Sequence, residues 1–165
     1  MKLAGVAIHG SKLYESIQPN QVTYSIKMKE TYSTGGGNDG NGNPIPVGTG
    51  TRWVDVGTDS TGAKITGYVS VPFSKMKLSG VNVAKVGDIT IETWRAEPPI
   101  PESNDNYIYT ATSPTQGTGQ GKIISGSSKA NLDGKPIALI GSQVETCLGT
   151  ITTIQTGNTK MNFKE

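Results

Sequence analysis

Two stretches of the sequence, residues 74–88 and 128–142, repeat one another without a gap. Six pairs of identical residues stand at shared offsets, namely Ser74 and Ser128, Lys75 and Lys129, Leu78 and Leu132, Gly80 and Gly134, Ala84 and Ala138, and Gly87 and Gly141. Such a repeat predicts one structural unit that occurs more than once and buries a core shared with its neighbours. This self-similarity constrains the fold more than any single motif.

A partial third copy closes the sequence. Residues 126–132 are echoed by residues 157–163, so that Leu132 corresponds to Phe163. We interpret each full unit as a short strand, a tight turn containing Gly80 or Gly134, and a second strand that ends in glycine. The repeat therefore predicts short hairpins folded about one axis.

The small residues of the repeat indicate that this axis is crowded. Ala84 and Ala138 stand where only a methyl group is expected to fit, facing inward. Gly87 and Gly141 are expected to supply a positive φ or a close approach of two backbones. Hairpins around a narrow axis form a tapered body with little core per residue, and an apolar fraction of 33% suits such a body.

The composition excludes a helical bundle and favours strands and turns. The 165 residues contain 22 Gly, 9 Pro and 20 Thr against 6 Leu, and the length suits one ordinary domain. A formal net charge of +2 predicts no strongly basic surface, so we expect no nucleic-acid partner. No apolar run approaches the roughly 18 residues of a spanning helix, and we expect a soluble protein made in the cytoplasm.

Three runs outside the repeat predict strands. Residues 22–29 alternate apolar and polar side chains at period two, which is typical of a half-buried strand. Residues 53–56 and 65–71 are predicted as two further strands, joined by a hairpin turn at residues 59–62. These runs indicate a β-meander.

Two long glycine- or proline-rich segments are predicted as loops. Residues 33–51 hold a run of Gly and Asn that is expected to form a mobile surface loop. Residues 95–121 are predicted as an inserted loop with one short strand near residues 107–109. The predicted organisation is a β extension over residues 1–69 and a repeat domain over residues 70–165.

The two full units resemble the PAAR repeat, which is named for a Pro-Ala-Ala-Arg signature usually followed by an aliphatic residue and Gly-Asp. Residues 82–88 read Asn-Val-Ala-Lys-Val-Gly-Asp, and residues 136–142 read Pro-Ile-Ala-Leu-Ile-Gly-Ser. The signature is usually preceded by Gly-Ser and by an Asn- or Asp-Gly turn, and Gly126-Ser127 and Asp133-Gly134 match these features; Cys147 is also in place. The first copy lacks Pro and has Lys in place of Arg, whereas the second lacks Arg and ends in Ser rather than Asp.

The resemblance implies a small conical all-β protein that sits as one copy on the blunt end of a trimeric β-helical spike. Such tips sharpen the membrane-piercing end of contractile tails in phages, type VI secretion systems and tailocins. It therefore implies manufacture in a bacterial cytoplasm, assembly into a virion baseplate or injection apparatus, and transient contact with a target cell membrane. Spike docking is expected from the three partial repeats ending near Leu78, Leu132 and Phe163.

Members of this family often hold zinc or iron near the point of the cone through three His and one Cys. This sequence offers one histidine, His9, and one cysteine, Cys147. A closed tetrahedral site needs four ligands. We therefore expect no metal or other cofactor, with His9 and Cys147 as the only weak candidates.

No constellation of residues predicts an enzyme. His9 would have to serve any acid-base pair alone, and neither a nucleophile elbow nor a phosphate-binding loop is present. Glu92, Glu97 and Glu102 are interpreted as solvated loop charges. We therefore expect no catalytic residues, in line with the structural spike tip that the resemblance implies.

The alternative is a β-rich receptor- or carbohydrate-binding module of a tail fibre or adhesin. In that case the segments around residues 33–51 and 98–121 would make the contacts. Trp94, Tyr107 and Tyr109 would be the aromatic residues available to stack on a sugar.

Overall fold

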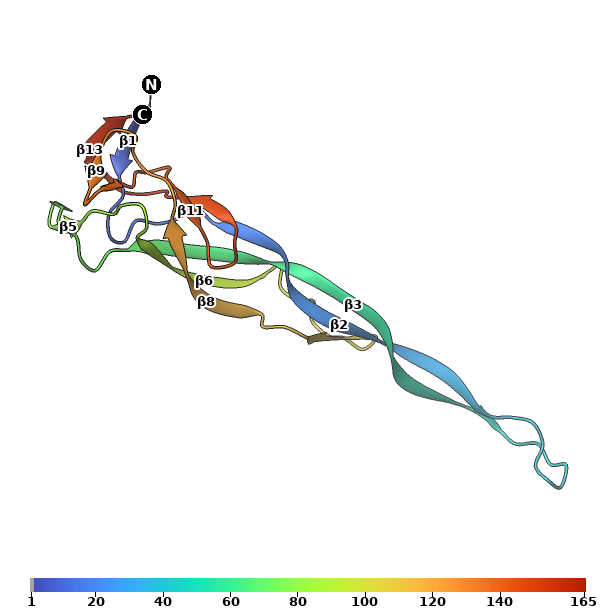
Figure 1. Ribbon diagram of the computed structural model, residues 1–165. Coiled ribbons are helices and arrows are strands. Elements are labelled where there is room, and N and C mark those ends of the chain that lie inside the picture. The colour runs from blue at the N-terminus through green and yellow to red at the C-terminus, as the bar shows by residue number, and fades with distance from the viewer. Residues whose placement is uncertain (1) are drawn as a thin grey trace.

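The computed structural model describes residues 2–165 and contains no helix in that range, which confirms the predicted all-β class. Figure 1 shows an elongated molecule: β1, β5, β9 and β13 gather at one end, and the ribbon of β2 and β3 extends far beyond the other strands at the opposite end. The strands are β1 (Leu3–Val6), β2 (Ser16–Gly35), β3 (Val47–Ser70), β4 (Lys77–Leu78), β5 (Val81–Asn82), β6 (Ile89–Glu97), β7 (Tyr107–Ala111), β8 (Gln116–Ile123), β9 (Asn131–Leu132), β10 (Lys135–Pro136), β11 (Gln143–Glu145), β12 (Ile151–Thr153) and β13 (Asn158–Lys164).

Seven strands form one antiparallel sheet in the order β12-β11-β8-β6-β3-β2-β7. Three further antiparallel pairs, β4-β5, β9-β10 and β1-β13, stand as separate two-stranded sheets. The molecule therefore consists of a head with three short hairpin-like pairs and a long sheet that narrows to two strands (Figure 1).

A closed ring of backbone hydrogen bonds joins the three pairs at the centre of the head. The Ala7 amide donates to the Ala138 carbonyl at 2.9 Å, Ala138 donates to Ala84 at 3.0 Å, and Ala84 donates back to Ala7 at 3.0 Å. All three alanines have an exposed fraction of 0%. A larger side chain at any of these positions would enter the same crowded centre.

Two further sets of bonds repeat with the same threefold pattern. In each copy, the residue two positions after the ring alanine donates its amide to a carbonyl of another copy. The acceptor is the residue that precedes the Val-Ala or Ile-Ala pair of that copy. His9 donates to Asn82 at 2.8 Å, Val86 to Pro136 at 2.9 Å, and Ile140 to Gly5 at 2.8 Å. The following glycine then donates to a strand of the large sheet or its border: Gly10 to Val69 at 2.8 Å, Gly87 to Ile123 at 2.9 Å, and Gly141 to Ile154 at 2.8 Å. The head is therefore pseudo-threefold.

The third copy is divided between the two ends of the sequence. Residues 157–163 supply the strand β13, and residues 3–11 supply β1, Ala7 and the glycine turn. The sequence comparison found the first part but missed the second. Val6 and Ala7 align with residues 83–84, and Gly10 aligns with Gly87. An alignment that runs along the sequence in one direction cannot join this half to residues 157–163.

Two apolar clusters lie on either side of this arrangement. The cluster that includes the ring alanines packs with residues of the large sheet: Ala7, Leu13, Val69, Val71, Ala84, Ile123, Ala138, Val144 and Ile154. The second cluster lies among the three hairpin-like pairs and has a fully buried centre: Val6, Val83, Ile137 and Leu139. The residue before each ring alanine therefore belongs to one cluster and the alanine to the other, as expected from strand alternation.

The predicted hairpin turn at residues 59–62 is wrong. β3 runs without interruption from Val47 to Ser70, because β2 pairs with it over nearly its whole length, from Ser16 opposite Ile65 to Gly35 opposite Val47. The ladder of hydrogen bonds outweighs the local turn preference. The turn-forming residues instead lie beside shifts in the β2-β3 register, and the predicted strand over residues 22–29 is confirmed as part of β2.

Both predicted loops are shorter than expected. Strand pairing leaves only residues 36–46 between β2 and β3, and β7 and β8 occupy much of residues 95–121. A cross-strand aromatic ring covers a strand glycine in each region: a Cβ added to Gly50 would lie 2.7 Å from the Tyr32 ring, and one added to Gly117 would lie 2.7 Å from the Trp94 ring. The rings supply packing that glycine lacks, so these Gly-rich stretches form strands.

The strands assigned to the predicted extension and to the predicted repeat domain share one sheet. β3 pairs with β6 along Gly62 to Ser70, and β1 pairs with β13. Strands from before residue 69 and after residue 70 therefore interleave in both the head and the sheet.

Replacement of Ala138 by leucine should destabilise the protein by about 1–3 kcal/mol, because the added atoms overpack the centre of the ring. Chemical denaturation would measure the loss. Ala111 in β7 is exposed, so Ala111→Leu is a matched control that should change stability little. Equal stability of the two variants would contradict a tightly packed ring.

Candidate functional site

The three hairpin-like pairs together present one apolar surface, which we call the hairpin face. Its members are partly buried side chains that pack over the second core cluster: Met76, Leu78, Ala130, Leu132, Met161 and Phe163. They form two equivalent triples, one of Met76, Ala130 and Met161 and one of Leu78, Leu132 and Phe163. The structure therefore brings the three predicted docking residues into one cluster.

Two tight turns fix two sectors of this face. Ser79 and Gly80 have φ values of 51° and 79°, and Asp133 and Gly134 have values of 55° and 80°. Positive φ at both central residues is the conformation that lets two adjacent strands continue their natural twist through a two-residue turn. Leu78 and Leu132, which immediately precede these turns, are thereby held at equivalent positions.

The third sector has no covalent turn and is closed by side chains. Phe163 pairs with Ala4 across β13 and β1. The Glu165 carboxylate accepts hydrogen bonds from the Ser127 hydroxyl, from the Ser128 amide at 3.0 Å and from the Ser128 hydroxyl at 2.7 Å. These donors, together with the nearby Lys129 ammonium, hold the pKa of Glu165 below its ordinary value.

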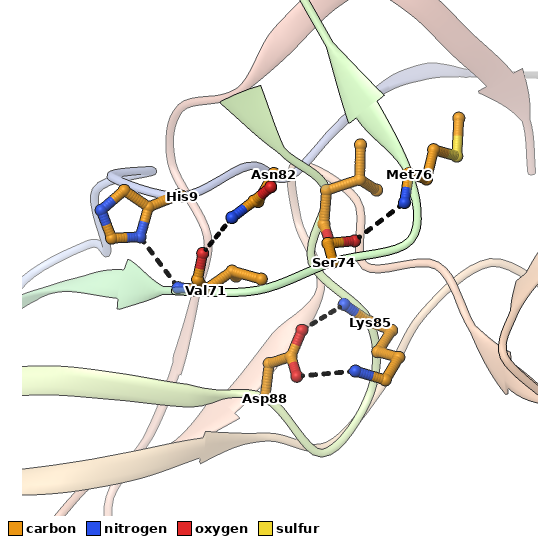
Figure 2. Close-up of polar contacts among 8 residues, drawn as sticks. His9, Val71, Ser74, Met76, Asn82, Lys85 and Asp88 are labelled. Carbon is orange, nitrogen blue, oxygen red and sulfur yellow. Dashed lines mark hydrogen bonds and ion pairs between the residues drawn. The ribbon is translucent and has the colours of Figure 1, made fainter. Parts of the chain in front are cut away.

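In each copy, the residue after the ring alanine donates its amide to a side chain three residues further along the chain. Figure 2 shows this contact for Lys85 and Asp88. The Lys85 amide donates to Asp88 Oδ2 at 2.9 Å, and the Lys85 ammonium donates to Oδ1 at 3.0 Å. A serine hydroxyl accepts the corresponding amide in the other copies, from Ile8 to Ser11 at 2.9 Å and from Leu139 to Ser142 at 2.8 Å. Serine can replace aspartate here because the contact needs only an acceptor oxygen.

The glycines singled out by the repeat occupy equivalent backbone conformations. Gly87 and Gly141 have φ values of 96° and 94°, and Gly10 of the divided copy has a value of 87°. A side chain at these positions would be strained whatever the surrounding space. Their amides donate to the large sheet or its border, so they couple the hairpin pairs to the body of the molecule.

His9 and Cys147 have different neighbours. His9 Nδ1 accepts the Val71 amide at 2.9 Å in the head, as Figure 2 shows. The Cys147 amide donates to Glu92 Oε1 at 2.7 Å, and burial, together with the neighbouring Glu92 carboxylate, raises the pKa of the Cys147 thiol to about 11. Residues 2–165 contain no cluster of three or more His, Cys, Asp or Glu that could hold a metal, so the residues described do not fit the four-ligand cage known from PAAR proteins.

The interpretation of Glu92 as a solvated loop charge is wrong. Glu92 lies in β6 with an exposed fraction of 0%, and Thr90 Oγ1 donates to its Oε2 at 2.5 Å. Space for this carboxylate comes from Gly121 on β8, where an added Cβ would lie 2.2 Å from Glu92 Oε2. The glycines at alternate positions of β8 could have predicted the burial of Glu92, because they leave room for large side chains on the facing strand.

The aromatic residues of the sugar-binding alternative do not form one platform. Tyr107 and Tyr109 on β7 stack with ring centroids 6.1 Å apart. Tyr109 also forms a T-shaped pair with Tyr24, with ring centroids 6.0 Å apart. Trp94 instead lies on β6 against Gly117. β6 and β7 are separated by β3 and β2 in the sheet, so the three rings serve different parts of it.

Comparison with protein-family models, curated proteins and solved structures found no match. Among residues 2–165 there is no helix of the length and apolarity needed to cross a membrane. The hairpin face is the feature that combines predicted binding residues with partly exposed apolar side chains.

Glu165→Gln should lower the melting temperature more at pH 6 than at pH 2. A carboxylate with a lowered pKa stabilises the fold above its unfolded pKa of about 4.3, and this contribution is lost as the pH falls through the folded value. Exposed Glu145 provides the control variant Glu145→Gln. A melting difference for Glu165→Gln that is equal at both pH values would contradict the assigned role.

Proposed function

We propose that this protein is the tip of a membrane-puncturing spike, docked through its hairpin face on the end of a trimeric β-helical spike protein. The observation that carries the proposal is the pseudo-threefold head, in which one chain repeats the same contact three times around one axis. A partner made of three identical chains offers the same surface three times. A single copy of this protein can then satisfy all three at once.

The apolar character of the hairpin face supports a docking role. Leu78, Leu132 and Phe163 are only partly buried, and they cover a fully buried apolar centre. Interfaces with high complementarity place such side chains at the middle and polar groups at the rim. The end of a β-helix would cover the face and protect the short edge strands around it.

The shape of the molecule supports a mechanical role. The sheet narrows from several strands beside the head to the two strands β2 and β3, which end in the loop at residues 36–46 (Figure 1). With the hairpin face on the spike, the ribbon would point away from it and meet the target membrane first. This function needs rigidity and docking and requires neither a catalytic group nor a metal.

The resemblance to the PAAR repeat agrees with this proposal, because Ala84 and Ala138 of the two matching copies, together with Ala7 of the divided copy, form the ring. The same contact recurs where the second copy departs from the signature, since Ser142 accepts the Leu139 amide as Asp88 accepts the Lys85 amide. Assembly into a phage baseplate, a secretion apparatus or a tailocin would follow from the identity of the spike.

Leu132→Gln should weaken binding to the trimeric spike protein encoded in the same gene cluster by at least about tenfold, because a central apolar anchor is lost. Co-elution and titration by biolayer interferometry would measure it. Val56 on the ribbon is 50% exposed, so Val56→Gln is a control that should bind normally.

Truncation after Gly149 removes β12 and β13 and should abolish binding by deleting one sector. Leu132→Gln keeps the test decisive if the truncated chain does not fold. Normal binding by a folded Leu132→Gln variant would contradict docking through the hairpin face.

A further inference from the structure

Lysines gather on the segments that surround the hairpin face. Residues 2–6, 74–83, 127–137 and 157–165 contain two carboxylates, Asp133 and Glu165, against seven lysines: Lys2, Lys75, Lys77, Lys129, Lys135, Lys160 and Lys164. The whole chain has a net charge of only +2, so the remainder of the molecule is net acidic. The positive charge is therefore concentrated at one end.

Three of these lysines occupy equivalent positions in the three copies. Lys75, Lys129 and Lys160 each immediately precede a member of the hairpin face. All three are exposed, whereas the residues that follow them are partly buried. The lysines thus lie around the apolar centre with the same pseudo-threefold arrangement.

Two of the three are held by the next hairpin-like pair. The Lys75 ammonium donates to Asp133 Oδ1 at 2.9 Å, and Lys75 lowers the pKa of that carboxyl. The Lys129 ammonium donates to the carbonyl of Lys164, which occupies the position equivalent to Asp133. An ammonium group has three donors, so each can still bind an acceptor on a partner.

We propose that Lys75, Lys129 and Lys160 form a docking ring that recognises a matching ring of carboxylates, one from each chain, on the end of the spike. This inference rests on the proposed function and specifies the chemistry of its partner. Complementary charges at the rim of an interface steer encounter and fix register, while the buried apolar centre supplies most of the affinity. Three equivalent ion pairs would also set the rotation of the tip on the trimer.

A membrane with anionic lipids would also attract a basic face with an apolar centre. A fluid lipid surface responds mainly to the total positive charge and has no threefold order. The equivalence of the three lysine positions therefore favours a trimeric protein as the partner.

The test compares two triple variants of equal net charge. Lys75, Lys129 and Lys160 are changed to glutamine in the rim variant, and exposed Lys12, Lys27 and Lys122 are changed in the control. Association with the trimeric spike protein from the same gene cluster is followed by stopped-flow fluorescence, and thermal melting verifies that both variants fold. The rim variant should associate about tenfold more slowly at low salt. This difference should nearly vanish at about 0.5 M salt, whereas the control should match the unmodified protein throughout.

The possible outcomes separate the two proposals. Equal association rates for the rim variant and the unmodified protein would overturn the docking ring and leave the spike-tip function standing. Absence of spike binding by the unmodified protein would overturn the spike-tip function itself. A third outcome would be that the rim variant loses binding to vesicles of phosphatidylglycerol and phosphatidylcholine but binds the spike unchanged. This outcome would assign the three lysines to a membrane and overturn the docking ring.

Discussion

The closed hydrogen-bond ring of Ala7, Ala84 and Ala138 is the constraint on which the rest of the structure depends. It brings three segments that are far apart in sequence to one axis and leaves room only for methyl groups. Because side chains alternate, the residues before the alanines point into the hairpin end, and the alanines themselves pack with the sheet. The ring thus fixes both the apolar hairpin face and the direction in which the sheet leaves the head.

The sequence allowed the repeating parts of this fold to be predicted and the extended parts only partly. Glycine, alanine and leucine positions at shared offsets indicated the turns, the axis and the predicted docking residues. The copy divided between residues 157–163 and 3–11 was missed because its two halves meet only in space. Glu92 was misassigned because its burial depends on glycines of another strand, which no local pattern around Glu92 reveals.

The β2-β3 ribbon illustrates a different limit of sequence analysis. Its glycine and aspartate residues have weak strand preference, and each turn signal is reasonable on its own. Pairing along both strands, with Tyr32 over Gly50 and the Arg52 guanidinium 4.9 Å from the Tyr32 ring centre, overrides those signals. Long-range pairing therefore decides the shape of the narrow end, just as it decides the closure of the head.

We propose that one pseudo-threefold chain caps three identical chains. Native mass spectrometry of the protein mixed with the proposed trimeric spike protein measures this stoichiometry directly. We expect a complex with one copy of this protein per spike trimer, even when this protein is in excess. A complex with three copies per trimer, or a self-associated trimer of this protein that leaves the spike unbound, would contradict it.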